Sequence, residues 1–439
     1  MILTIVTFLA VLIILVLAHE MGHYITARAK GVKILEFGLG FPPRIYGIKR
    51  GETIYSINLL PLGGFVKLAG EEDPNVPGSL ASKSAGSRLL VLSSGALVNL
   101  LLPIIFFSLA AMIPHNVLLE PVVIARVEPN SPAYYAGFKA KDTILSFNGR
   151  PVENTNDLRR YIRLNLGNQV NIVVRDSSGV NRSLRVAPKW NPPQGQELMG
   201  IALLEPVVVA EVAPGSPAAI AGFRAGDTVL SADGTKLENL ADLQSYTRLN
   251  LGKEITVVVK GTDAAERTLK VTPRSNPPAG QGAMGIRLSN FDANPNIVRR
   301  TEPFWRAIPA GMRECIDAFV LFKNEIITWF VGTGAPQVVG PVGMAEMTGE
   351  VIRSGFSNLL EWAAFISINL GIVNLLPIPA VDGGRIAFVF LELVRRGKRV
   401  APRTEGLIHL IGFFLLIGLM LLVTYRDIIN IVVSGSAIP

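Results

Sequence analysis

The sequence is poor in the residues that build most metal sites and cross-links. It contains one cysteine and four histidines in 439 residues. The single cysteine, Cys315, excludes an internal disulfide and a cysteine-rich zinc site. Charged residues make up only 17% of the chain and hydrophobic residues 49%. This composition is too apolar for a soluble enzyme and predicts several membrane spans.

The sequence contains several long apolar segments with few or no charged residues. Four of them have the length to cross a membrane: residues 2–18, 89–113, 359–381 and 406–425. The first segment lacks a basic region before it and a small-residue cleavage site. We therefore interpret it as a membrane span rather than a cleaved signal peptide.

Lysine and arginine are concentrated in two short loops beside these segments. Nine lie between the first and second segments, and six lie between the third and fourth. Both loops are therefore predicted to be cytoplasmic, with the long segment between spans two and three, and both termini, outside. This distribution accounts for the net charge of +8 without a nucleic-acid partner.

Two of the four histidines occur at the end of the first apolar segment, in His19-Glu20-Met21-Gly22-His23. Positions i and i+4 share one face of a helix, so both imidazoles can bind one metal ion, with Glu20 as a base. The alternative is a pair of helix-end histidines that face lipid headgroups. Because the motif lies in a predicted span, the leading hypothesis is hydrolysis inside the bilayer.

A third candidate ligand lies near the end of the third apolar segment, between Asn374 and Gly384. Asp382 is costly there unless a cation neutralises it. Two imidazoles, one carboxylate and a water form a common catalytic zinc set. Pro377 and Pro379 break the helix and expose backbone groups with which an extended substrate can pair. The alternative is an aspartate that caps a helix end.

The segment between spans two and three contains an internal repeat. Glu120-Pro-Val-Val-Ile-Ala matches Glu205-Pro-Val-Val-Val-Ala, and the same offset continues without a gap to Met199-Gly-Ile and Met284-Gly-Ile. Roughly half of the positions are identical. In each copy, Ser-Pro-Ala and Ala-Gly-Phe precede an Asp-Thr pair and a β-rich run.

These motifs resemble those of PDZ domains of the bacterial protease type. Copy two has the usual Ala225-Gly226-Asp227, whereas copy one has Lys141 in place of the glycine, which is less suited to a positive φ. PDZ domains bind extended peptides by strand addition. The resemblance implies binding of peptide ends or substrate ectodomains. The alternative, inert spacers or steric gates, is equally open.

The two ligand motifs together resemble those of the site-2 protease family of intramembrane zinc metalloproteases. The similarity covers nearly the whole chain and is closest to the bacterial regulator-of-sigma-E type with tandem PDZ domains. It implies Zn²⁺ on His19, His23 and Asp382, and Glu20 as the catalytic base. It also implies substrate binding by three residues of the second motif, Asn374, Pro377 and Pro379. Val381 stands where the family usually has leucine.

Two further segments carry the resemblance. Residues 61–67, Pro-Leu-Gly-Gly-Phe-Val-Lys, resemble part of a membrane-associated β-hairpin in the family, where Gly64 and Phe65 would align substrate. The alternative is an ordinary cytoplasmic hairpin. Gly95-Ala-Leu-Val-Asn99 lies where the family has Gly-Pro-x-x-Asn. Asn99, grouped with the substrate-binding candidates, would bond a site group or another helix. His115 and His409 lack ligand spacing and are interpreted as structural.

The predicted fold is an α-helical polytopic membrane protein with four transmembrane helices, a cytoplasmic-side β-hairpin and two inserted β-rich PDZ domains. Residues 1–115 would hold transmembrane helices 1 and 2, and residues 358–439 helices 3 and 4. The PDZ domains would occupy 116–204 and 205–290, followed by an interfacial amphipathic segment at 291–357.

The resemblance implies a zinc-dependent endopeptidase of the bacterial inner membrane. It would cut transmembrane segments of single-pass proteins, such as an anti-sigma factor already trimmed by another protease. The PDZ domains would be extracytoplasmic, and the zinc site would lie near the cytoplasmic side of the bilayer. The alternative is a membrane-anchored PDZ adaptor with a structural metal site. A zinc transporter is a weaker third reading, because the polar residues cluster at one end of the spans.

Overall fold

The structure is a computed structural model that describes residues 2–71, 73–193, 196–205, 207–237, 239–263, 265–278, 281–289, 296–332 and 339–434. Two parts of the predicted interfacial segment, 291–295 and 333–338, lie outside the described residues.

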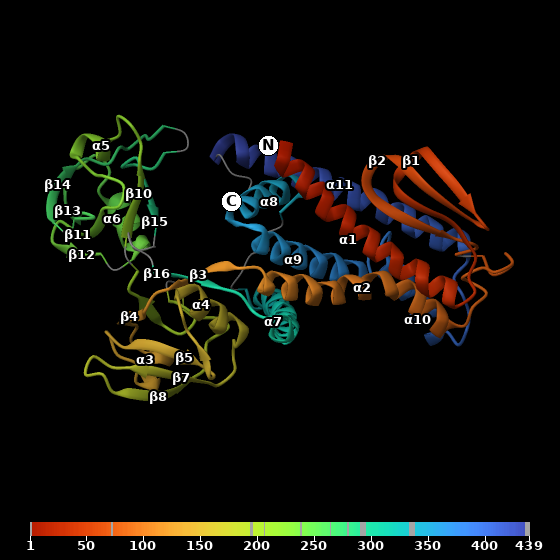
Figure 1. The fold of residues 1–439 in the computed structure, drawn as a ribbon, viewed down its shortest axis with the longest axis horizontal. Coiled ribbons are helices and arrows are strands. Elements are labelled where there is room, and N and C mark those ends of the chain that lie inside the picture. The colour runs from red at the N-terminus through yellow and green to blue at the C-terminus, as the bar shows by residue number, and fades with distance from the viewer. Residues whose placement is uncertain are drawn as a thin grey trace.

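Four helices are long and apolar enough to cross a membrane. They are α1 (Ile2–Ala29), α2 (Ala85–Met112), α9 (Phe356–Leu375) and α11 (Pro402–Ser434). All four predicted spans are therefore confirmed as helices, although their ends differ by several residues. α1, α2 and α9 pack together, and α11 contacts α8. A β-hairpin lies at one end of the spans and the repeats lie beyond the other end (Figure 1).

The third predicted span, residues 359–381, does not continue as one helix to residue 381, and the helix breaks at the two prolines where the sequence predicts a break. α9 ends at Leu375, because Pro377 and Pro379 lack the N–H groups that would continue it. A loop of residues 376–381, which we call the site loop, leads into α10 (Asp382–Val394). Asp382 therefore begins a new helix instead of ending the span.

The predicted hairpin is a bent sheet built from β1 (Ile34–Arg50) and β2 (Thr53–Leu68). Both strands fold back, so residues 36–39 pair with 54–57 on one side and with 64–67 on the other. Among the described residues, no strand pairs with the outer side of 64–67. This segment, which we call the edge segment, is the free edge that the sequence suggested.

The internal repeat folds into two β-rich units of the same topology, called the first and second repeat. Their sheet orders are β8-β7-β5-β4-β9 and β14-β13-β11-β10-β15, with β6 and β12 paired to β5 and β11. The elements of the first repeat are β4 (Val122–Val127), α3 (Pro132–Ala136), β5 (Thr143–Phe147), β6 (Arg150–Pro151), α4 (Thr155–Leu164), β7 (Val170–Arg175), β8 (Asn181–Val186) and β9 (Ile201–Leu203).

The second repeat places equivalent elements in the same order, at the offset that the sequence repeat shows. They are β10 (Val207–Val212), α5 (Pro217–Ala221), β11 (Thr228–Ala232), β12 (Thr235–Lys236), α6 (Leu240–Leu249), β13 (Ile255–Lys260), β14 (Glu266–Val271) and β15 (Ile286–Ser289). Each unit has its own buried apolar core. Ser131 and Ser216 cap the short helices α3 and α5 in the same way.

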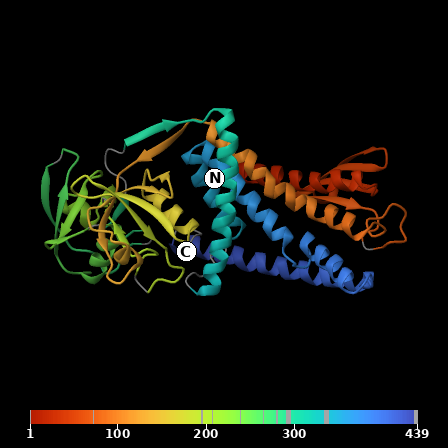
Figure 2. The same ribbon diagram turned by 90° about the horizontal axis from the view of Figure 1, so that it is seen from below.

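Two strands join the repeats to the spans. β3 (His115–Leu119), after α2, pairs antiparallel with β16 (Asn296–Arg300), which precedes α7 (Phe304–Val331). The two ends of the inserted segment are thus held together by this strand pair. α7 packs against α2 and runs across the ends of the spans rather than along them (Figure 2). Its location in the membrane interface stays a prediction. α8 (Pro341–Ser354) packs between α1 and α9.

Candidate metal centre

Three potential metal ligands converge from two helices that are far apart in the sequence. His19 and His23 lie one turn apart on α1, and each is only 7% exposed. The Oδ2 atom of Asp382, on α10, lies 3.0 Å from Nε2 of His19 and 3.2 Å from Nε2 of His23, and the two nitrogens are 3.2 Å apart. No other group of three such residues occurs in the described part of the chain.

This triangle of atoms fits a tetrahedral metal ion such as zinc. Bonds of about 2.0–2.1 Å place neighbouring ligand atoms about 3.3 Å apart in a tetrahedron, close to the 3.0, 3.2 and 3.2 Å found here. Gly95 of α2 faces the same atoms, and a Cβ there would collide with Nε2 of both imidazoles. The donor set is suitable, and glycine leaves the space beside it open.

Both imidazoles have a second contact with α2. Nδ1–H of His23 donates to the Val91 carbonyl at 2.8 Å, so Nε2 of the neutral ring keeps its lone pair toward Asp382. The side-chain nitrogen of Asn99, which is fully buried, lies 3.3 Å from Nδ1 of His19. Of the two contacts that the sequence left open for Asn99, the structure has the one to a site group.

Glu20 lies between the histidines on α1 and contacts the edge segment. The backbone of Val66 lies next to its carboxylate. A Cβ on Gly64 would lie only 3.3 Å from Cγ of Glu20, so glycine allows the strand to come close. The sheet edge and the carboxylate are thereby brought to one place.

The remaining substrate-binding candidates lie on the segments that flank the ligands. Phe65 follows Gly64 in the edge segment. Asn374 is half-buried in the last turn of α9, and Pro377 is exposed in the site loop. Pro379 packs against α11. These residues lie on the segments that lead to Asp382 or that contact Glu20, and their contact with substrate stays a prediction.

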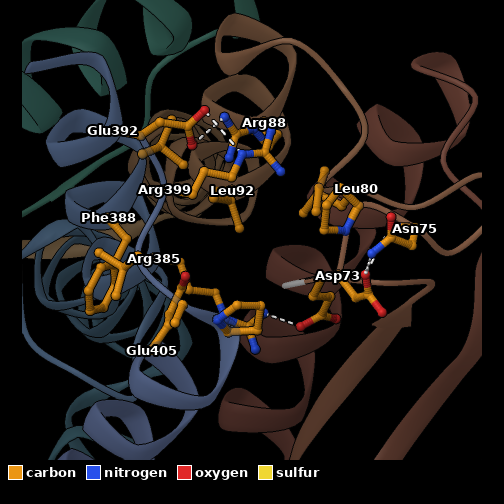
Figure 3. Close-up of a pocket in the computed structure, with 17 residues that line it drawn as sticks. Asp73, Asn75, Leu80, Arg88, Leu92, Arg385, Phe388, Glu392, Arg399 and Glu405 are labelled. Atoms are coloured by element: carbon orange, nitrogen blue, oxygen red, sulfur yellow. Dashed lines mark hydrogen bonds and ion pairs between the residues drawn. The ribbon is translucent and has the colours of Figure 1, made fainter. Parts of the chain in front are cut away.

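Ion pairs that sequence reasoning missed fix α10 in place. Arg88, in the first turn of α2, donates to Glu392 at 2.8 Å, and Arg399 donates to the same carboxylate at 3.2 Å. Arg385 pairs with Glu71. These side chains line a cavity of about 380 Å³ beside α10 (Figure 3). Arg88 is buried, whereas the sequence marked it only as one of the cytoplasmic cations.

The two arginines set the charge state of Glu392. Burial by itself would raise the pKa of this carboxyl, but the hydrogen bonds from Arg88 and Arg399 outweigh burial and hold the pKa below its ordinary value. Glu392 therefore stays ionised at neutral pH, and it ties α10 to both α2 and the loop before α11.

Comparison with known proteins agrees with this site. The model of peptidase family M50 matches residues 7–419. The zinc metalloprotease RasP of Geobacillus kaustophilus is 30% identical and covers 97% of each chain. The regulator of sigma-W protease RasP of Bacillus subtilis is 29% identical and covers 97% of this chain and 98% of its own. The probable protease eep of Enterococcus faecalis is also 29% identical, with the same coverage.

Among solved structures, the PDZ domain of an SdrC-like protein from Listeria monocytogenes matches 20% of this chain and 92% of its own. The identity is 21% and the TM-score 0.18, which is too small a similarity to define the fold of the repeats. The family match spans nearly the whole sequence. The chain therefore belongs to peptidase family M50, the site-2 protease family. It is a metalloprotease and an integral membrane protein.

Proposed function

We propose that this protein is a zinc-dependent endopeptidase that cuts transmembrane segments within the bilayer. The observation that carries the proposal is the triangle of His19, His23 and Asp382, in which three ligand atoms lie 3.0–3.2 Å apart. The triangle is formed by a membrane-spanning helix and the first residue of α10. Glu20, on the same turn of α1, is the proposed general base.

When bound, zinc would supply a Lewis acid that lowers the pKa of a water ligand to about 7 and polarises the scissile carbonyl. Glu20 accepts the proton from the attacking water and passes it to the leaving amine. Val91 and Asn99 orient the imidazoles. If the Asn99 amide is flipped, so that its oxygen and nitrogen exchange places, the oxygen accepts a hydrogen bond from Nδ1–H of His19. That oxygen otherwise lacks a partner among the described residues.

Substrate alignment is assigned to the edge segment. A helical carbonyl is already hydrogen-bonded, so a transmembrane substrate must unwind before it is cut. Pairing with the free edge at 64–67 replaces the lost backbone bonds by strand addition. This edge contacts Glu20, so a paired substrate would lie beside the base. Asn374, Pro377 and Pro379 would contact it from the opposite side.

The orientation follows from the charged loops. The arginine- and lysine-rich loops between the paired spans support an orientation with the hairpin and the ligand triangle on the cytoplasmic side and the repeats outside. The expected substrate is a single-pass protein of the bacterial inner membrane, such as an anti-sigma factor, trimmed outside by another protease. The repeats, as PDZ domains, would bind the trimmed end or exclude an untrimmed ectodomain.

The test is cleavage of a single-pass substrate with a trimmed outer domain, in proteoliposomes containing the purified full-length protein. The wild type should cut, a zinc chelator should stop it, and Glu20→Gln should retain zinc but lose at least about 1,000-fold in rate. Glu361→Gln, on α9 and outside the ligand triangle, is the matched control and should cut normally.

Two outcomes would contradict the proposal. Cutting by Glu20→Gln at the wild-type rate would remove Glu20 from its role. Stoichiometric zinc binding with no cleavage of any trimmed substrate would favour the adaptor alternative. Cleavage of untrimmed substrate at the same rate as trimmed substrate would leave the protease intact but exclude gating by the repeats.

A further inference from the structure

A histidine on the fourth span makes a hydrogen bond with the site loop. The backbone N–H of Ala380 donates to Nδ1 of His409 at 2.9 Å. Ala380 lies two residues before Asp382, and two of the residues around it, Pro377 and Pro379, have no N–H to offer. This bond therefore attaches the backbone leading into the third ligand to α11.

Ala380 has a backbone conformation that needs support. Its φ is +77°, in the left-handed region where a residue with a side chain is disfavoured. Such a conformation persists only when its surroundings hold it. The bond to His409 provides that support, and it also gives the partly buried N–H of Ala380 a hydrogen-bond partner.

The packing around the histidine is close enough to leave little freedom. A Cβ on Gly384 would lie 3.1 Å from Cε1 of His409. One turn further along α11, a Cβ on Gly412 would collide with Pro379. The ring of Phe388 lies 5.6 Å from the imidazole. The two glycines thus allow α11 to contact the site loop and the start of α10 directly.

The rest of α11 makes this contact more notable, because most of the helix is exposed. On the same helix, Asp427 is buried and accepts hydrogen bonds from the backbone of Gly340 and Gly343 at the start of α8. Asp427 therefore attaches α11 to α8, and His409 attaches it next to the ligand triangle.

We infer that His409 is a positioning residue for the metal site: through Ala380 it sets the path of the site loop and the direction in which Asp382 faces His19 and His23. The inference rests on the proposed zinc site. The ring accepts with Nδ1, so Nε2 carries the proton, and Nε2 is buried without a partner in the described part of the chain. The contact with Ala380 is thus the hydrogen bond that the histidine makes here.

The test compares three variants of the full-length protein in detergent. His409→Phe keeps an aromatic ring but removes the acceptor. His409→Asn restores an acceptor, Oδ1, at the position of Nδ1. Asp427→Asn weakens the attachment of α11 to α8 and is the matched control. The readouts are the zinc dissociation constant against a competing chelator, the visible spectrum of the Co²⁺-substituted protein, and kcat and KM separately.

We expect His409→Phe to raise the zinc dissociation constant roughly tenfold, as loss of other groups that orient metal ligands does. It should also shift the Co²⁺ spectrum and lower kcat more than KM changes. His409→Asn should recover most of each effect, and Asp427→Asn should leave zinc affinity and spectrum unchanged. The inference is overturned if His409→Phe binds zinc with wild-type affinity and spectrum, or if Asp427→Asn matches its defects.

These results separate the inference from the proposed function. If the wild type binds no zinc in the triangle, or cuts no substrate in spite of zinc, the proposed function fails whatever the variants do. If the wild type binds zinc and cuts, and His409→Phe is indistinguishable from it, only the positioning role fails.

Discussion

The contacts that stabilise the inserted repeats differ from those that stabilise the membrane core in their sequence separation and in whether they are duplicated. In the repeats, Asp142 pairs with Arg182, and Asp227 pairs with Arg267 in the equivalent place. Each pair is 40 residues apart in the chain. In the core, the contact between His19 and Asp382 joins residues 363 apart and has no copy elsewhere in the described residues. Local, duplicated contacts build the repeats, whereas single long-range contacts build the site.

The repeats themselves differ in how they are attached. Arg150 and Arg160 of the first repeat form ion pairs with Asp317 and Glu314 of α7. The equivalent positions in the second repeat are Thr235 and Ser245, so these ion pairs cannot form there. Two copies of one fold therefore share a core but not their contact with the spans, because core residues follow the repeat and surface residues need not.

The largest effect on metal binding and cleavage is expected from adding a single methyl group in the membrane core. Gly95→Ala places a Cβ against both imidazoles, so metal should be lost and cleavage should fall at least roughly 100-fold. Gly86→Ala, on the same helix with open space around it, is the control. Metal content and cleavage are measured, and hydrogen exchange in the repeats should not change. Wild-type activity in Gly95→Ala would refute the close contact.

A smaller effect is expected where α10 is anchored. Glu392→Gln removes the charge that accepts from Arg88 and Arg399, at a cost of about 1.5–3 kcal/mol in the unfolding free energy. The exposed Glu52→Gln, which breaks the pair with Lys33, should cost at most about 0.5 kcal/mol. Unfolding in mixed micelles measures both. Equal losses of unfolding free energy in the two variants would show that burial of the ion pairs on α10 does not increase their contribution to stability.

The ion pairs of Glu392 also make the unfolding free energy depend on pH. The folded pKa of Glu392 is depressed, so its contribution is present above the ordinary pKa of a glutamate and is lost as pH falls through the folded value. The stability difference between wild type and Glu392→Gln should therefore shrink on acidification. A difference that grows as the pH falls below the ordinary pKa of a glutamate would contradict the assignment.

An intermediate test makes the first repeat resemble the second. Arg150→Thr with Arg160→Ser removes both ion pairs to α7. Both arginines are partly exposed, so the loss should be about 1 kcal/mol in total. Distances between spin labels on α4 and α7 should broaden, while the core of the repeat remains protected from exchange. Unchanged distances would mean that these two ion pairs do not hold the domain against α7.

The smallest effect concerns one turn in which the repeats differ. Lys141 has φ +71° and its counterpart Gly226 has φ +89°, as the sequence suggested from the missing glycine. Lys141→Gly should stabilise the first repeat by about 0.5 kcal/mol. Gly226→Ala should destabilise the second, since its Cβ would also meet Thr262. Hydrogen exchange on β4 measures the stability of the first repeat, and exchange on β10 measures that of the second. If Lys141→Gly destabilised the first repeat, Lys141 would not be strained by its positive φ.

The sequence by itself determined the four spans, the shared helix face of His19 and His23, and the duplicated domain with its constant offset. Each of these is a local property, because apolar length, helical spacing and repetition can be read along one stretch of chain. It also identified Asp382 as a ligand candidate, from the cost of an aspartate in an apolar setting.

Only the tertiary structure decided which side chains complete the site. Asp382 begins a separate helix, Asn99 lies against His19, and His409 bonds to Ala380. The sequence treated His409 as remote because it has no ligand spacing. These contacts join residues from different helices, and neither spacing nor composition encodes which faces of packed helices meet. Packing sets that choice, and packing exists only once the chain has folded.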